Sequence, residues 1–279
     1  QGMFVIQSAI ADAAAQIGIN KLQIQEANLL AENDEFSYGQ IATEVQAKKA
    51  WFSAKEKFEF EKLEKEVENF NKTNKHFKKG ISLMPIAFGI SFTNTPMNHA
   101  RALVHIYQDG SVGVSTGAVE MGQSVNTKML QVAQQILGIS PNKVKLETTN
   151  TTRVANTSPT AASSTADLNG KAVEMACNSL IERLTKVATK MLSSKEENIS
   201  FLEDFVFVDG KKSTITWEEL IAQAMLQRVA LSENAHYATP IIHFDKSKEK
   251  GHPFAYHVYG TAITTVTVDC IRGNYEIDN

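Results

Sequence analysis

Small and polar residues gather in two short segments that each precede an expected helix, and these are the residues best suited to bind a ligand. The first segment is Glu120-Met121-Gly122-Gln123-Ser124, and the second, NTSPTAASS, covers residues 156–164. A helix start exposes unpaired backbone N–H groups at the positive end of the helix dipole, so it favours a bound anion. Two such starts predict a clamp for a phosphate-bearing cofactor.

The side chains in these segments fit that prediction. Gly122 allows a ligand to approach the backbone closely, and the amide of Gln123 can both donate and accept hydrogen bonds. In the second segment, Ala161 and Ala162 leave room for a ligand, and three hydroxyl groups lie beside the exposed N–H groups: Ser163, Ser164 and Thr165. The same patterns also fit simple helix caps, with Ser124 capping the first helix, so the local pattern leaves both interpretations open.

A third candidate site is the segment FGISFT at residues 88–93, which places two aromatic rings four residues apart. Phe88 and Phe92 could hold a flat substrate between them, with the Thr93 hydroxyl as a hydrogen-bond partner. An ordinary core segment is the alternative interpretation.

Motifs for other chemistries are missing from the sequence. The closest pair among the seven His residues, His252 and His257, has no carboxylate or Cys at ligand spacing, so no protein-ligated metal is predicted. No Gly-x-Gly-x-x-Gly or P-loop pattern occurs either. These gaps weaken a dinucleotide or nucleoside triphosphate interpretation.

Composition gives the broad class. The chain has 279 residues, 43% of them hydrophobic, and a net charge of −3, which predicts a globular protein with a sizeable core and gives no case for nucleic acid or membrane binding. Only Cys177 and Cys270 occur, so we expect no disulfide framework and no iron–sulfur cluster on this chain. The compartment expected from this cysteine usage is the reducing cytoplasm.

Hydrophobic periodicity predicts an α+β fold with mixed sheets that carry helices. The expected turns are Gln108-Asp109-Gly110, which joins two strands, and Gly138, which ends a helix. A charge-rich surface helix is expected over residues 46–72, and the alternation of Val144, Leu146 and Thr148 predicts a strand. The other expected helices cover residues 3–17, 125–136, 165–191 and 217–225, and the other strands cover 102–107, 111–116, 205–208 and 256–268.

Taken together, the segments resemble the large molybdenum-cofactor-binding part of the molybdenum hydroxylases, and among these the xanthine dehydrogenases. The resemblance runs along essentially the whole chain, and the combination of EMGQ with SPTAAS is its most specific part. The matching stretches are FGISFT (88–93), YQDGSVGVSTGAVEMGQS (107–124), NTSPTAASS (156–164) and PFAYHVYG (253–260). Ser124 and Thr165 depart from the usual Gly and Ser, and Thr265 stands where an acidic residue is common.

The resemblance implies roles for the candidate residues. Gly122 and Gln123 would contact the pterin dithiolene and its phosphate, and Ala162 would contact the molybdenum centre through its backbone. The second side of the cofactor would be lined by Ala161, Ala162, Ser163 and Thr165. A purine would lie between Phe88 and Phe92, beside Thr93.

The resemblance also implies a larger enzyme that oxidises hypoxanthine or xanthine to urate with oxygen from water. Residues 1–45 would end a first molybdenum-cofactor-binding domain, and residues 46–279 would begin a second. FAD and [2Fe–2S] clusters would lie in partner domains or in another subunit of a dimeric assembly. The catalytic Glu would follow Asn279, and a Gly-rich loop and an Arg-containing segment would precede Gln1, so the segment alone is expected to be inactive. The alternatives are an enzyme of the aldehyde oxidase type and a non-catalytic scaffold.

Overall fold

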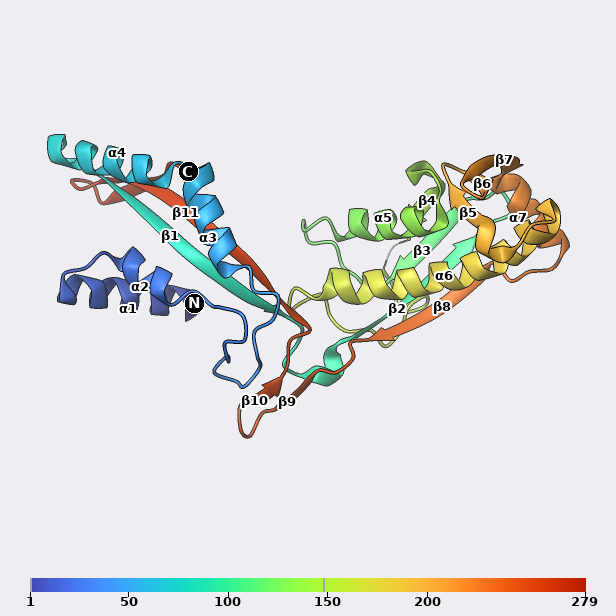
Figure 1. Ribbon diagram of the computed structural model, residues 1–279, viewed down its shortest axis with the longest axis horizontal. Helices are drawn as coiled ribbons and strands as arrows, with labels where there is room; N and C mark the ends of the chain where they lie inside the picture. The colour runs from blue at the N-terminus through green and yellow to red at the C-terminus, as the bar shows by residue number, and fades with distance from the viewer. Residues whose placement is uncertain (1, 148) are drawn as a thin grey trace. The chain divides into compact units, whose positions relative to one another are not determined.

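The computed structural model describes residues 2–147 and 149–279, which form two compact units (Figure 1). Unit 1 contains the residues up to Ile90 together with Asp245–Asn279, and unit 2 contains Ser91–Phe244. Unit 2 is therefore inserted in the sequence between the two parts of unit 1. The two units are defined by their internal contacts. They do not test the domain boundary between residues 45 and 46 that the family resemblance implies, which stays a prediction.

A long antiparallel ribbon is the centre of unit 1. Strand β1 (Phe77–Ile90) pairs with β11 (Tyr256–Asp269) along its whole length, and β12 (Asn274–Ile277) adds a third strand beside β11. The Thr and Val residues of β11 favour an extended backbone, and the strand predicted over residues 256–268 is confirmed. Strand β1 was not predicted, because Gly80 and Pro85 interrupt its apolar pattern.

Four helices pack around this ribbon, and Figure 1 shows α3 and α4 running alongside it. Helix α1 (Gly2–Ile17) confirms the first predicted helix, and α2 (Lys21–Ala27) follows it. The single helix predicted over residues 46–72 is wrong: α3 (Ala47–Lys57) and α4 (Phe60–Thr73) are separated at Phe58-Glu59, where Glu59 has a positive φ of 48°. Neither helix is only a solvated surface, since Trp51 and Phe60 are fully buried in a cluster with Leu83.

Helix α2 lies along the free edge of β1. The side-chain amide of Gln25 is only 4% exposed, and its Nε2 atom donates to the carbonyl oxygen of Leu83 at 3.0 Å. One turn earlier, Lys21 Nζ donates to the hydroxyl oxygen of Ser82 at 3.1 Å. Two side chains of one short helix thus bond to neighbouring residues of this strand, one of them to its backbone.

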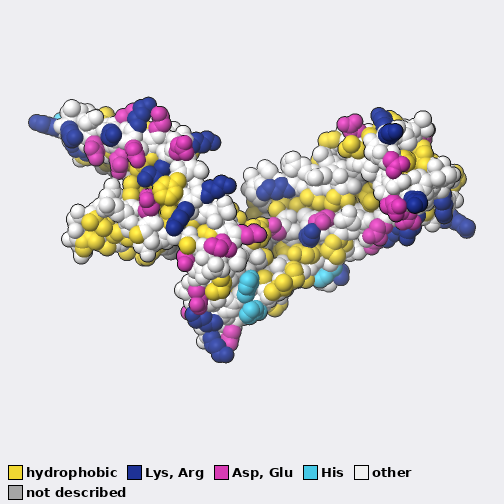
Figure 2. Space-filling model, in the orientation of Figure 1, with side chains coloured by type: hydrophobic (Ala, Val, Ile, Leu, Met, Phe, Trp, Pro, Cys, Tyr) yellow, Lys and Arg dark blue, Asp and Glu magenta, His cyan; other side chains and the backbone are white. Residues whose placement is uncertain are grey.

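The outer surface of α1 is unusually apolar. Figure 2 shows hydrophobic side chains gathered over this helix, and Phe4, Val5 and Ile17 are each at least 66% exposed. Over α4, by contrast, Lys and Glu side chains cover the surface (Figure 2). Among the described residues no one helix is long and apolar enough to cross a membrane, although α1 and α2 pass such a test together as a bent pair.

Unit 2 has a four-stranded sheet in the order β4-β3-β2-β8. Its strands are β2 (His99–Ile106), β3 (Val112–Thr116), β4 (Val144–Leu146) and β8 (Ser232–Ala238). The predicted hairpin is confirmed, and the carboxylate of Asp109 accepts a hydrogen bond of 2.9 Å from the amide of Ser111 in its turn. Strand β4 confirms the predicted alternation at Val144 and Leu146, whereas Thr148 lies outside the described residues. Strand β8 was missed because its sequence, SENAHYA, has little apolar alternation.

Two helices cover one face of this sheet and complete the core of unit 2. They are α5 (Val125–Leu137) and α6 (Thr165–Leu192), and both begin where the sequence predicts. Gly138 ends α5 with a φ of 68°, as expected for a helix stop. The core is apolar, and it includes Met129, Leu180 and Leu184, all almost fully buried.

A smaller sheet and a last helix complete unit 2. The strands are β5 (Ile199–Leu202), β6 (Phe205–Val208) and β7 (Lys211–Thr216), and α7 (Trp217–Leu226) follows with a Thr216–Glu219 capping box. The indole N–H of Trp217 donates to the carbonyl oxygen of Gly110 at 2.8 Å, which ties α7 to the β2–β3 turn. The short strands β9 (His243–Asp245) and β10 (Lys250–His252) come next along the chain. The predicted strand at 205–208 and helix at 217–225 are confirmed, and the α+β class holds throughout.

Candidate functional site

The two candidate segments lie in the loops before α5 and α6, which we call the Gln123 loop (residues 117–124) and the Ala162 loop (residues 156–164). Together they line a single pocket of about 440 Å³ in unit 2. Five of the candidate residues lie on its wall: Gln123, Ala161, Ala162, Ser163 and Thr165. Gly122 is not on this wall, although the space beside its Cα is open and its φ of 97° favours glycine. The wall is completed by Met121, Val125, Lys128, Thr160 and Ala166. Residues about 40 positions apart in the sequence therefore converge on one cavity, which is the geometry that a clamp requires.

A side-chain hydrogen bond and close packing join the two loops. The amide nitrogen of Val119 donates to the hydroxyl oxygen of Thr160 at 2.9 Å. Two residues before Val119, a Cβ atom added at Gly117 would lie 2.2 Å from Cγ2 of Thr157, so only glycine fits there. The pocket wall is thus built from loops that support each other.

The carboxylate of Glu120 closes the start of α5. Its Oε1 atom accepts hydrogen bonds from the amides of Gly122 and Ser124, both at 2.9 Å, and Oε2 accepts from the amide of Asn126 at 3.0 Å. These bonds, that from Asn126 foremost, hold the pKa of the Glu120 carboxyl below its ordinary value. The side chain of Ser124 makes no capping bond, so the expected Ser124 cap is wrong and Glu120 is the cap. An acidic residue just before a helix was the signal in the sequence that could have identified it.

The side chain of Gln123 braces its own loop. Its Oε1 atom accepts from the amide of Met121 at 2.6 Å, and its Nε2 atom donates to the carbonyl oxygen of Val119 at 2.8 Å. A primary amide has two N–H donors and two acceptor lone pairs. One donor and one lone pair therefore remain, and they suffice for the donor-and-acceptor role predicted for Gln123.

The turn that leads into α6 differs, because several amides at residues 162–165 are not capped. Among the described residues, the backbone N–H groups of Ala162, Ser163 and Thr165 have no hydrogen-bond partner, and Ser164 at the N-cap makes no side-chain capping bond. Ala162 and Ser163 both have a φ of 53°, a backbone conformation that non-glycine residues rarely adopt. Such conformations cost free energy and persist where the surrounding structure enforces them. This helix start, unlike that of α5, keeps donors for an anion.

The predicted aromatic slot is divided between the two units. Phe88 lies in β1 of unit 1 and is 45% exposed, whereas Phe92 and Thr93 lie in unit 2. The buried side chain of Asn98 bonds to both backbone groups of Phe92. It accepts from the Phe92 amide at 2.7 Å and donates to the Phe92 carbonyl at 2.8 Å, and the sequence alone did not identify it. The backbone at Phe92 is therefore fixed, while the pairing of the two rings stays a prediction.

His257, one of the His pair near the end of the chain, lies in an aromatic cluster of unit 1. The ring of His257 stacks on Phe36 with centroids 4.4 Å apart, and its Nε2 atom lies 2.9 Å from the hydroxyl oxygen of Tyr38. Burial raises the pKa of Tyr38 to about 12, and burial together with His252 lowers the pKa of His257. The described residues contain no group of three or more His, Cys, Asp or Glu side chains placed to hold a metal ion. Packing against these aromatic rings explains the position of the His257 side chain.

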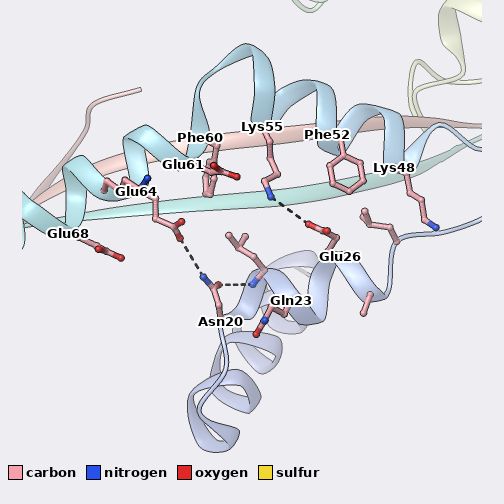
Figure 3. Close-up of a pocket in the computed structure, with 14 residues that line it drawn as sticks. Asn20, Gln23, Glu26, Lys48, Phe52, Lys55, Phe60, Glu61, Glu64 and Glu68 are labelled. Carbon is pink, nitrogen blue, oxygen red and sulfur yellow. Dashed lines mark hydrogen bonds and ion pairs between the residues drawn. The ribbon is translucent and has the colours of Figure 1, made fainter.

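A larger hollow, a groove of about 910 Å³, lies in unit 1 between α2 and the α3–α4 pair (Figure 3). Two of its charged side chains pair with each other: Glu26 lies 3.6 Å from Lys55 Nζ, and Glu26 also accepts from the indole of Trp51 at 2.9 Å. None of the candidate residues lines this groove. Size alone does not identify the site, and the smaller pocket of unit 2 carries the predicted chemistry.

Comparison with known proteins gives a consistent family. Residues 53–279 match the molybdopterin cofactor-binding domain model. The chain is 35% identical over 276 residues to xanthine dehydrogenase/oxidase of Gallus gallus and 37% identical over 276 residues to aldehyde oxidase 2 of Macaca fascicularis. In both cases the match covers 99% of this chain and 19% of the relative. The chain thus spans about a fifth of the length of the curated relatives it matches.

The fold comparison agrees. The crystal structure of quinoline 2-oxidoreductase from Pseudomonas putida 86 superposes with a TM-score of 0.78 at 19% identity, covering 99% of this chain and 36% of that one. The α+β arrangement of small sheets and helices is therefore the fold of molybdenum-cofactor-binding domains in molybdenum hydroxylases.

Proposed function

Because the chain belongs to the molybdopterin cofactor-binding domain family, we propose that the pocket of unit 2 holds one side of a molybdopterin cofactor. The observation that carries this proposal is the convergence of the Gln123 loop and the Ala162 loop on one cavity. Either loop alone would fit a helix cap. Two loops that share a pocket and are joined by Thr160 fit a ligand clamp better.

The residues present fit such a group. The start of α6 offers unpartnered amides for an anionic substituent, and Lys128 adds a positive charge to the same wall. Gln123 contributes one donor and one acceptor from the opposite loop. Ala161 and Ala162 keep their own part of the wall clear of bulky side chains. Bound there, the cofactor would supply the redox centre for hydroxylation of an electron-poor carbon.

For the complete enzyme we propose oxidation of hypoxanthine and xanthine to urate. The support is the 35% identity to xanthine dehydrogenase/oxidase together with the Phe88, Phe92 and Thr93 contacts predicted for a flat purine. An enzyme of the aldehyde oxidase type is the second candidate, and the 37% identity to aldehyde oxidase 2 favours it. A non-catalytic scaffold is the third, and the intact pocket argues against it.

The proposal extends to partners and location. FAD and [2Fe–2S] clusters would be carried by other domains or by another subunit, and the assembly would be a dimer in the reducing cytoplasm. The general base for hydroxylation is not assigned to any residue of this chain. We therefore expect the purified segment, without the rest of the enzyme, to oxidise neither purines nor aldehydes.

The test is purification of the full-length protein, followed by assay of molybdenum, pterin and turnover. Molybdopterin with oxidation of xanthine and hypoxanthine would support the first candidate. Molybdopterin with oxidation of aldehydes but not purines would assign the second. A folded full-length protein without molybdenum or pterin would contradict the proposed function and leave the scaffold. Turnover of xanthine by the 279-residue segment alone would contradict its expected inactivity.

A further inference from the structure

Glu120 is placed to control the shape of the first pocket loop. One oxygen of its carboxylate, Oε1, accepts from the amides of Gly122 and Ser124, which are the residues on either side of Gln123. The other oxygen reaches the amide of Asn126 in the first turn of α5. The backbone at Gln123 is therefore held on both sides by one side chain.

The turn that Glu120 holds is not one that the chain adopts readily. Gly122 has a φ of 97° and Ser124 a φ of 62°, so two left-handed residues flank Gln123. Serine is disfavoured in this conformation, and such a residue persists when surrounding bonds enforce it. The bonds to the amides of Gly122 and Ser124 are the ones that do so.

The same bonds remove the start of α5 as a place for a ligand's anion. Its first amides already face a resident carboxylate, so a second negative group there would meet like charge. The loop's remaining polar contribution to the pocket is the side chain of Gln123, whose direction depends on the backbone that Glu120 fixes.

We propose that Glu120 is a positioning residue that acts through Gln123, a role that rests on the proposed cofactor site. Glu120 is not among the residues that line the pocket. It holds the turn at residues 120–126 so that the free donor and acceptor of Gln123 are oriented before the cofactor binds. An alternative is that Glu120 only stabilises α5 as a helix cap.

The experiment compares Glu120→Gln with Asp109→Asn in the full-length holoenzyme. Asp109 is a matched control, because it is another exposed carboxylate of unit 2 that accepts a backbone amide bond in a turn, and it lies in the β2–β3 hairpin away from the pocket. Each protein is assayed for melting temperature and for the rate of pterin release, with release measured at the same interval below each melting temperature. We expect Glu120→Gln to release pterin about tenfold faster than wild type, as when a partner that orients a ligand is removed. Asp109→Asn should match wild type.

A double-mutant cycle with Gln123→Ala separates positioning from helix capping. If Glu120 acts through Gln123, the Glu120→Gln/Gln123→Ala protein should release pterin no faster than Gln123→Ala alone. Additive effects of the two substitutions, or pterin release by Glu120→Gln equal to that of Asp109→Asn, would overturn the inference. Glu120→Gln keeps the side-chain shape and one carbonyl acceptor, so it is the variant used in preference to Glu120→Ala. A wild-type protein without pterin would overturn the proposed function and this inference with it, whereas a pterin-containing wild type confines the failure to Glu120.

Discussion

The hydroxyl oxygen of Thr160 accepts a hydrogen bond of 2.9 Å from the amide of Val119, and this bond links the two loops of the pocket. The loops belong to separate stretches of the chain, with α5 and β4 between them. The shape of the pocket therefore depends on a contact that neither loop can provide alone.

Thr160→Val tests this link, because valine keeps the branched shape and removes the acceptor. We expect a loss of about 1 kcal/mol of stability, the typical net value of one hydrogen bond, and faster cofactor release from the full-length enzyme. Thr152→Val is the control, since among the described residues the Thr152 hydroxyl bonds within its own turn, to Asn150. Equal cofactor release by the two variants would show that the bond to Val119 does not shape the pocket.

Ala162 combines a strained backbone with a position on the pocket wall. Because its φ is 53°, Ala162→Gly should relieve backbone strain. The greater freedom of glycine in the unfolded chain offsets part of this effect, so the net gain in stability should be about 0.5 kcal/mol. Ala162→Val should lose about 1 kcal/mol or more, because a β-branched residue tolerates this conformation poorly. Thermal unfolding and pterin content would check both: valine should also exclude the cofactor, and glycine should not.

Gly138 allows the end of α5 to pack closely against β5. A Cβ atom there would lie 2.1 Å from the carbonyl oxygen of Phe201, and the φ is 68°. Gly210 has a similar φ of 72° but open space around it. We expect Gly210→Ala to cost about 1 kcal/mol through backbone strain alone. Gly138→Ala should cost about 3 kcal/mol or more, because a backbone carbonyl cannot move aside as a side chain can. Similar melting temperatures for the two variants would contradict this packing.

The stability of unit 1 should depend on pH through His257. Its pKa in the folded protein lies below the ordinary value of 6.5, so the folded state favours the neutral ring. The stability that the neutral His257 ring contributes is therefore complete above pH 6.5, and it is lost as the pH falls through the lowered pKa of His257. His257→Gln, which cannot be protonated, should flatten the fall in melting temperature between pH 6.5 and pH 5. Because His252 contributes to this lowering of the His257 pKa, His252→Gln is made in parallel, and an unchanged slope in His257→Gln would refute the assignment.

The fold was predictable where local sequence signals act alone. The Asp109-Gly110 turn, the Gly138 stop and the apolar periodicity of α5 and α6 all appear where expected. The predictions that failed are those that depend on tertiary packing. The charged stretch at 46–72 divides at Glu59 because Trp51 and Phe60 are both buried in the core of unit 1, and hydrophilic neighbours hide that burial in the sequence. Strand β1 is extended by its pairing with β11, a partner more than 160 residues away in the sequence.

The candidate pocket was predictable in outline but not in its hydrogen bonds. The sequence places small residues before two helices, and five of the candidate residues lie on one wall. It does not reveal which amides are already satisfied. Glu120 closes one helix start while the other stays open, a difference that depends on the direction of one carboxylate. The roles of these residues towards a cofactor stay predictions.

The amide of Gln25 at the edge of β1 has a consequence for the solubility of the folded protein. A 14-residue strand with a bare edge is a template onto which a strand from another molecule can add, and growth of that kind leads to aggregates. The side chain of Gln25 already occupies one carbonyl of this strand, that of Leu83, so an incoming strand would have to displace it there. Displacement of helix α2 would therefore free the Leu83 carbonyl and make this part of the ribbon easier for a strand of another copy to recruit.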